Sequence, residues 1–257
     1  MTEQSAITVA GLAKTYGQAD NQVHAVAGID FAVPKGSVTA LLGGNGAGKT
    51  TTIAMLLGLL KPTAGSISIL GTDMLRERHR ILPRLNFSSP YVDLPHRLTV
   101  RQNLMVFAGL YAVNGAAQRI AQLAGELDFA MLLDRPAGAL SAGQKTRVAL
   151  AKALINQPDM LLLDEPTASL DPDTADWVRS LLERYRAERG TTILLASHNM
   201  SEVERLCDQV LMMKQGRIVD RGTAPELISR YGRRNLEEVF LDIARGQGKA
   251  AEQKVPA

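Results

Sequence analysis

A glycine-rich segment, residues 43–50, constrains the fold of this chain more than any other feature. Its sequence is Gly-Gly-Asn-Gly-Ala-Gly-Lys-Thr, between an apolar run at residues 38–42 and a helical pattern at 49–60. A strand that enters a glycine-rich turn and continues as a helix is typical of a phosphate-binding loop. Glycines let the backbone wrap around an anion, and the helix N-terminus attracts the negative charge. The sequence therefore predicts an α/β protein that binds phosphate at this turn.

The pattern G-x-x-x-x-G-K-[ST] assigns distinct roles within the loop. Lys49 is expected to reach the β- and γ-phosphates of ATP, and the Thr50 hydroxyl to ligate Mg²⁺. A chance match in an ordinary turn is the alternative, and the flanking strand and helix argue against it. The residues predicted to bind the nucleotide here are Gly43, Gly44, Asn45, Gly46, Ala47, Gly48, Lys49, Thr50 and Thr51.

Apolar runs alternate with helical patterns along the chain. The runs at residues 38–42, 160–163 and 192–196 are short and mostly apolar, and the second is apolar at every position, as expected of strands buried on both faces. Strands that alternate with helices predict a parallel sheet covered by helices. Between residues 85 and 150 the apolar residues recur at helical spacing, which predicts an inserted α-helical subdomain.

The C-terminal part is predicted to contain a short helix and a tail. Leu236, Val239 and Ile243 mark an amphipathic helix over residues 233–245. Residues 246–257 are polar and without periodicity, so we expect them to be disordered. Residues 1–232 are then expected to form the main domain.

Two acids, Asp164 and Glu165, directly follow the apolar run at residues 160–163. Open α/β sheets bind ligands at the carboxyl ends of their strands, so both acids should lie beside the phosphate loop. There Asp164 would hold Mg²⁺ through water, and Glu165 would act as general base for the attacking water. His198, after the run at 192–196, should lie near the γ-phosphate. Without the loop, solvated acids and an exposed histidine would be the simpler interpretation.

The segment at residues 140–144, Leu-Ser-Ala-Gly-Gln, precedes a long helical pattern. Ser141 and Gln144 have the spacing of a capping box, which explains both residues structurally. A capped helix end that contains glycine is also an anion site, and spacing alone does not separate the two interpretations. Ser201 and Glu204 have the same spacing and predict the start of the helix after His198.

Charge, cysteine content and hydropathy argue against several classes of protein. The 29 basic and 26 acidic side chains leave a net charge of +3, too small to indicate a nucleic-acid partner. The one cysteine, Cys207, cannot form an internal disulfide and suits a reducing compartment. The N-terminus has no pattern of a secretion signal, and no run approaches the ~18 apolar residues of a membrane span. If the protein acts at a membrane, we expect another chain to provide the span.

Together these segments resemble the nucleotide-binding subunit of an ABC transporter, over about residues 7–222. Several motifs in the family's order are far more specific than any one of them. The matching motifs are the adenine-stacking aromatic at Tyr16 (in isolation a core residue), the Walker A loop at residues 43–50, the LSGGQ signature at 140–144, the Walker B acids Asp164 and Glu165, the D-loop at 168–171 and the switch histidine His198.

The resemblance implies a P-loop NTPase core with a parallel sheet, an N-terminal antiparallel β subdomain and the inserted helical subdomain. It implies a head-to-tail homodimer, with each ATP and Mg²⁺ between the loop of one copy and Ser141, Gly143 and Gln144 of the other. Asp171 would link the two sites, and the catalytic residues would be Glu165, His198 and Lys49. The implied partner is a permease at the cytoplasmic face of the inner membrane.

Three positions depart from the family pattern. Ala142 replaces a signature glycine, and Gly44 stands where the family commonly has proline. Ser88 occupies the place of a glutamine that senses Mg²⁺ and contacts the membrane partner. Serine can ligate water but reaches less far than glutamine, so Ser88 is the expected third metal-site residue.

Two segments narrow the subfamily. Residues 98–104 and 235–240 resemble the ATPases of type-2 ABC exporters, so an exporter is the leading hypothesis. A soluble ABC ATPase acting on ribosomes or nucleic acid is the first alternative, disfavoured by the single cassette, the absence of heptads and the small net charge. An unrelated phosphate-loop kinase is the second, and the signature and His198 argue against it.

Overall fold

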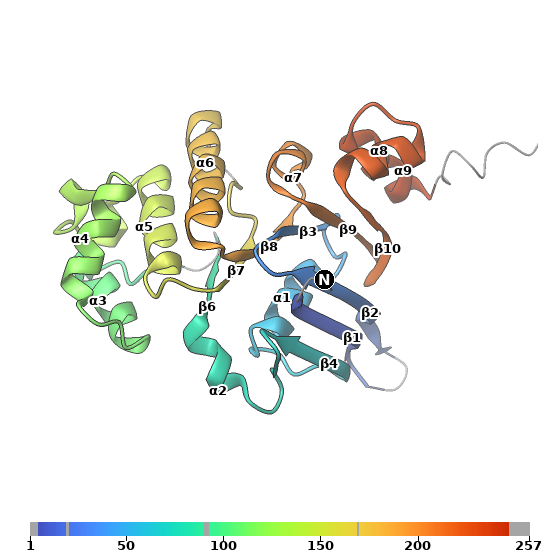
Figure 1. Ribbon diagram of the computed structural model, residues 1–257, viewed down its shortest axis with the longest axis horizontal. Coiled ribbons are helices and arrows are strands. Elements are labelled where there is room, and N and C mark those ends of the chain that lie inside the picture. Colours follow the sequence, from blue (N-terminus) through green and yellow to red (C-terminus); the bar gives the residue numbers. More distant parts are fainter. Residues whose placement is uncertain (1–4, 19–20, 90–92, 169, 247–257) are drawn as a thin grey trace, which may run out of the picture.

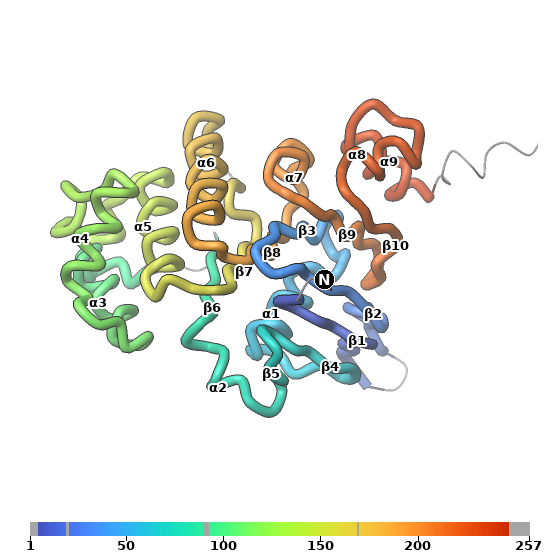
Figure 2. The backbone as a smooth tube through the Cα atoms, viewed as in Figure 1, coloured from blue at the N-terminus to red at the C-terminus, as the bar shows by residue number. Residues whose placement is uncertain are grey.

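The computed structural model describes residues 5–18, 21–89, 93–168 and 170–246, which fold around two β-sheets (Figures 1 and 2). Within these residues the first sheet is antiparallel, with the strand order β2-β1-β4-β5. Its strands are β1 (Ser5–Tyr16), β2 (Val23–Pro34), β4 (Ala64–Ile69) and β5 (Thr72–Asp73). The expected N-terminal antiparallel unit is confirmed.

The second sheet forms the centre of the molecule, with the strand order β10-β9-β3-β8-β7-β6 in the described chain. Its strands are β3 (Val38–Leu42), β6 (Leu85–Ser88), β7 (Met160–Asp164), β8 (Thr192–Ser197), β9 (Gln209–Lys214) and β10 (Arg217–Gly222). All neighbours pair in parallel except β9 and β10, which form an antiparallel hairpin. Because β3, β7 and β8 are parallel neighbours, their carboxyl ends meet at one edge.

Buried strands of this sheet send alternate side chains to opposite faces. Leu161 and Leu163 of β7 pack into the cluster that includes α5 (Ala142–Leu154) and α6 (Pro172–Arg189). Met160 and Leu162 pack instead with α1 (Lys49–Leu56) and the first sheet. Figure 1 shows α6 above the core sheet and α1 below it. This covering of both faces explains why β7 is apolar at residues 160–163.

The remaining helices form two groups. At the left of Figure 1, α3 (Val100–Leu110) and α4 (Ala116–Glu126) pack beside α5, as the predicted helical insertion requires. On the right, α7 (Met200–Leu206), α8 (Ala224–Tyr231) and α9 (Leu236–Arg245) share an apolar cluster with β3 and β9. The short helical turns are α2 (Arg78–Ile81), η2 (Leu82–Arg84), η3 (Ala130–Leu132) and η4 (Ala137–Ala139).

Three predicted boundaries were wrong. Helix α1 ends at Leu56, before residue 60, because Gly58 takes a left-handed conformation with φ 68°. The segment expected to be helical from residue 85 begins as β6, which pairs with β7. Helix α7 is capped by Asn199, whose side chain accepts from the Glu202 amide, and Ser201 lies inside the helix.

The C-terminal helix is present as α9, within the expected residues 233–245. Residues 247–257, most of the tail expected to be disordered, lie outside the described residues. The division into a domain of residues 1–232 with an inserted subdomain at 85–150 stays a prediction.

Candidate functional site

The phosphate loop passes between β2 and β9 on its way from β3 to α1. A Cβ on Gly43 would lie 2.6 Å from the carbonyl oxygen of Met213 in β9. A Cβ on Gly48 would lie 2.6 Å from the carbonyl oxygen of Ala25 in β2, and Gly48 also has φ 103°. Any larger residue would collide with neighbouring backbone, so both glycines are required for this path of the chain.

Lys49 starts α1 and directs its ammonium into the loop. Its Nζ donates to the carbonyl oxygen of Gly43 at 2.7 Å and to that of Gly44 at 3.4 Å. The side chain is only 7% exposed, and Nζ lies 3.8 Å from Glu165 Oε1. A nearly buried cation inside a glycine loop at a helix N-terminus is a site for phosphate.

Thr50 and Asp164 meet at the strand edge beside this cation. The Thr50 hydroxyl donates to Asp164 Oδ2 at 3.1 Å. Asp164 ends β7, is 2% exposed, and has no hydrogen-bond partner for its buried Oδ1 among the described residues. Burial raises the pKa of the Asp164 carboxyl, and the bond from Thr50 opposes that rise. A nearby cation would stabilise a buried carboxylate oxygen that has no hydrogen-bond donor.

Glu165 and His198 form a pair at the ends of β7 and β8. Glu165 has φ 52°, and its N–H donates to the Ala196 carbonyl oxygen at 2.8 Å. This turn aims the carboxylate inward, so that Oε2 lies 2.7 Å from His198 Nδ1. Glu165 is 12% exposed and His198 is 60% exposed. A non-glycine residue with left-handed backbone angles is locally strained, and such strain is often found at active sites.

Lys49, Thr50, Asp164 and Glu165 open onto one cavity of ≈ 520 Å³. His198 is outside its described lining and contacts it through Glu165. Tyr16 lies in its wall with 44% of its surface exposed, as the adenine-stacking hypothesis requires. The lining also includes residues that the sequence analysis missed, because β-sheet pairing and the β9–β10 hairpin bring them in from distant segments. The described lining consists of Tyr16, Val23, His24, Ala25, Gly44, Asn45, Gly46, Ala47, Gly48, Lys49, Thr50, Thr51, Asp164, Glu165 and Gln215.

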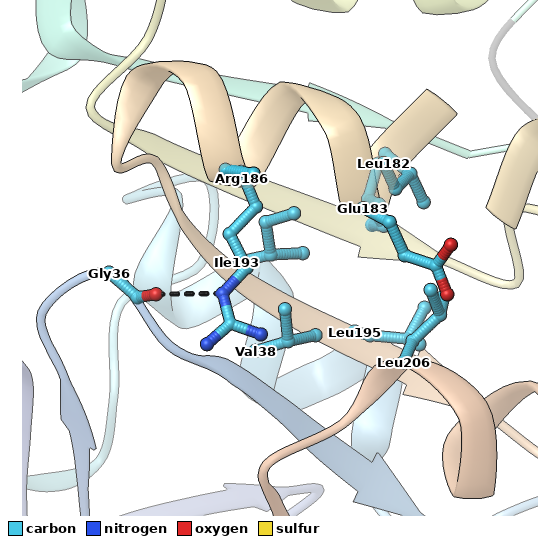
Figure 3. Close-up of a pocket in the computed structure, with 10 residues that line it drawn as sticks. Gly36, Val38, Leu182, Glu183, Arg186, Ile193, Leu195 and Leu206 are labelled. Atoms are coloured by element: carbon cyan, nitrogen blue, oxygen red, sulfur yellow. Dashed lines mark hydrogen bonds between the residues drawn. The ribbon is translucent and has the colours of Figure 1, made fainter. Parts of the chain in front are cut away.

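A second cavity of ≈ 420 Å³ lies beneath α6 and has a different character (Figure 3). Its Arg186 donates to the Gly36 carbonyl oxygen at 2.9 Å and pairs with Asp208 at 2.8 Å. Its Glu183 pairs with Arg205 at 2.9 Å. Both charged side chains are satisfied by protein groups, and most other residues in the described lining are apolar. The geometry therefore assigns phosphate binding to the first cavity.

The signature residues lie apart from this cavity, at the start of α5. The predicted capping box is present, with Gln144 N donating to Ser141 Oγ at 3.3 Å and Ser141 N to Gln144 Oε1 at 3.0 Å. Ser141, Gly143 and Gln144 are absent from the described lining of the nucleotide cavity. Within one copy of the chain, these residues cap α5. They do not line the described cavity at that copy's own phosphate loop.

Asp171 and Ser88 also lie outside the described lining. Asp171 caps α6 by accepting from Thr174 N at 3.0 Å, and this bond lowers the pKa of its carboxyl. Ser88 is buried at the end of β6, opposite Leu163 in β7. Ser88 therefore lies one strand away from the end of β7 that carries Asp164.

Comparison with known proteins decides the family. The family model described as ABC transporter matches residues 26–168, more than half of the chain. The chain belongs to the ABC transporter family. The chain is accordingly an ATP-binding subunit, and the enzyme is an ATPase.

Curated relatives and solved structures agree with this assignment. The chain is 38% identical over 239 residues to the Nod factor export ATP-binding protein I of Ralstonia nicotianae, covering 92% of this chain and 73% of that protein. It is 33% identical over 244 residues to the ABC transporter ATP-binding protein NatA of Bacillus subtilis, covering 93% and 99%. The structure of cbiO1 from Clostridium perfringens, part of the ABC transporter complex cbiONQ, superimposes with a TM-score of 0.75 at 32% identity, covering 95% of this chain and 97% of that chain.

Proposed function

We propose that this chain is the energy-coupling ATPase of a type-2 ABC exporter. The observation that supports it most is the contact of Glu165 with both Lys49 and His198, beside a cavity around the phosphate loop that Lys49 and Glu165 line. The exporter assignment is supported by the relatives named for Nod factor export and by the segments at residues 98–104 and 235–240.

Hydrolysis follows from the positions of these three side chains. Lys49 and the α1 N-terminus neutralise the phosphate charge, so the γ-phosphoryl group is held at the strand edge. The Glu165 carboxylate accepts the proton of a water that attacks this group. His198, 2.7 Å from Glu165, orients the carboxylate and reaches the γ-phosphate from the exposed side.

The residues present fit a Mg²⁺ ion beside the phosphates. Thr50 and Asp164 provide hydroxyl and carboxylate oxygens, the ligands that Mg²⁺ prefers, and Asp164 Oδ1 has no other described partner. The ion would supply charge neutralisation to the bound triphosphate. Ser88 is the proposed additional oxygen, at the end of the neighbouring strand.

A second copy of the chain would complete the site. The capped N-terminus of α5 presents Ser141, Gly143 and Gln144 outside the chain's own nucleotide cavity, although a helix N-terminus of this kind suits an anion. A head-to-tail homodimer places this end against the partner's ATP. Asp171, at the start of α6, would then link the two sites.

Two inactive variants should restore activity when mixed, if the site is shared in this way. A heterodimer of Lys49→Ala and Ser141→Arg chains has one site with an intact loop from one chain and an intact signature from the other. We expect ATP hydrolysis in the mixture after dissociation and reassociation, although each variant alone is inactive. The measurement is phosphate release against the mixing ratio. A mixture as inactive as its components would contradict the shared site, and a wild-type and Lys49→Ala mixture controls for exchange.

The proposed partner is an integral-membrane permease, with this chain bound at the cytoplasmic face of the inner membrane. In the described part of the chain, no helix combines the length and apolar character that a membrane span requires. The relative cbiO1 is part of the ABC transporter complex cbiONQ, which supports a similar assembly here.

Affinity purification from detergent-solubilised membranes tests the proposed function. We expect a tagged full chain to retain an integral-membrane protein with several predicted spans, and this protein to stimulate its ATP hydrolysis. The Glu165→Gln chain is the matched control, since it should retain the same partner without hydrolysis. Exclusive recovery with ribosomes or DNA would overturn the exporter assignment.

A further inference from the structure

Glu202 is a buried acid close to the catalytic pair, and the mechanism above does not use it. It lies in the first turn of α7 and has 0% exposure. Its Oε1 accepts from the Thr167 hydroxyl at 2.8 Å, and its Oε2 accepts from the Ser197 hydroxyl at 2.7 Å. One carboxylate thus binds two segments that are 30 residues apart in sequence and adjacent in the fold.

The two partners of Glu202 flank the catalytic residues. Thr167 is two residues after Glu165, in the turn that follows β7, and Ser197 directly precedes His198 at the end of β8. The Ser197 hydroxyl also accepts from the Asn199 amide at 3.0 Å, so the turn around His198 is bonded on both sides. The carboxylate of Glu202 therefore joins the turn that carries the base to the turn that carries the histidine.

Burial of the Glu202 carboxylate costs free energy, because the ionised group loses its contact with water. Burial raises the pKa of Glu202, and the nearby charge of Glu165 adds to the rise. Two hydroxyl donors offset only part of the desolvation of an ionised acid. An apolar residue would avoid this penalty but would leave both hydroxyls without their acceptor.

We propose that Glu202 is a positioning residue for ATP hydrolysis, which holds the Glu165 and His198 turns at the spacing that their 2.7 Å contact requires. The inference rests on the proposed roles of Glu165 and His198. The left-handed backbone of Glu165 (φ 52°) makes this support necessary, because a strained turn persists only when its surroundings hold it. A displacement of about 1 Å in a catalytic group can cost about 10²-fold in rate.

The same helix offers a matched control. Glu204 is also an acid of α7, but its Oε1 accepts from the Leu236 amide at the start of α9. A Glu204→Ala change removes this acceptor, which anchors α7 to α9 and not to the turns of Glu165 and His198. If Glu202 only anchored α7, variants at the two positions would behave alike.

The experiment compares Glu202→Ala, Glu202→Gln and Glu204→Ala in the full chain. For Glu202→Ala we expect kcat to fall by about 10-fold or more with an almost unchanged ATP dissociation constant, because the phosphate loop is not altered. Glu202→Gln should recover most of the rate, since its carbonyl accepts from Thr167 and its amide donates to Ser197. Thr167→Val and Ser197→Ala each remove one of the two bonds and should give smaller losses of kcat, which tests the idea even if Glu202→Ala does not fold.

A double variant separates a positioning role from an independent one. If Glu202 acts through Glu165, Glu202→Ala should cause no further loss of rate in a Glu165→Gln chain. A folded Glu202→Ala chain with wild-type kcat, or a loss of rate equal to that of Glu204→Ala, would overturn the inference. Full activity of Glu165→Gln itself would instead overturn the proposed base, so the two failures are distinguishable.

Discussion

The Glu165→Gln enzyme is expected to bind ATP normally and to hydrolyse it ~10²–10⁴-fold more slowly. Glutamine keeps the length and the Cβ of glutamate, so the turn at φ 52° and the hydrogen bond to Ala196 should persist. The change removes the proton acceptor and the negative charge that lies 3.8 Å from Lys49 Nζ. Single-turnover phosphate release, with nucleotide binding measured in parallel, separates the lost chemical step from any loss of affinity.

In the proposed dimer, this variant should also accumulate as an ATP-bound pair of chains, because hydrolysis no longer separates the two copies. Size-exclusion chromatography with and without ATP measures this shift. Glu183→Gln is the matched control, since Glu183 pairs with Arg205 at the second cavity, away from the phosphate loop. Retention of full activity in Glu165→Gln would show that another group accepts the proton.

The parts of the fold that were predictable from sequence are those in which local chemistry and tertiary structure agree. The strand, glycine turn and helix around residues 38–56 follow from the apolar pattern and the backbone freedom of glycine, and the buried strands β7 and β8 follow from short, mostly apolar runs. Strand β6 was missed because four residues carry too little periodicity, and its identity depends on pairing with β7.

Residues of the candidate site could be predicted where a motif lies on one continuous segment. They could not be predicted where strand pairing brings them to the cavity from distant segments. The loop, the acids after β7 and His198 were found from continuous segments, and the structure brings them together. His24 and Gln215 were missed, because only the β1–β2 and β9–β10 pairings carry them to the cavity.

Glu202 was missed for a related reason. The spacing of Ser201 and Glu204 predicted the wrong cap for α7, whereas Asn199 is the cap and the helix starts at Met200. That start turns Glu202 toward Thr167 and Ser197, a direction that depends on the helix register. The contacts of Glu202 can therefore be identified only from the structure, which shows how the ends of β7 and β8 lie relative to α7.

The Lys49→Ala enzyme is expected to fail one step earlier, at nucleotide binding. A hydrogen bond to a charged group contributes roughly 1.5–3 kcal/mol, so the loss of the ammonium should weaken ATP binding by roughly 10- to 150-fold. The carbonyl oxygen of Gly43 also loses its donor at 2.7 Å, which should loosen the loop and add to the effect. Titration with a fluorescent ATP analogue measures the dissociation constant directly.

Lys214→Ala is the control that distinguishes a specific contact from general charge near the loop. Lys214 lies at the end of β9, close to the loop, but its Nζ donates to the carbonyl oxygens of Ile243 and Ala244 in α9, at 2.7 Å and 3.1 Å. Both variants lose one positive charge, so a long-range electrostatic effect would weaken ATP binding in both. We expect only Lys49→Ala to lose affinity, because only its ammonium lies inside the glycine loop. Equal losses in the two variants, or wild-type affinity in Lys49→Ala, would contradict the direct role of Lys49 in phosphate binding.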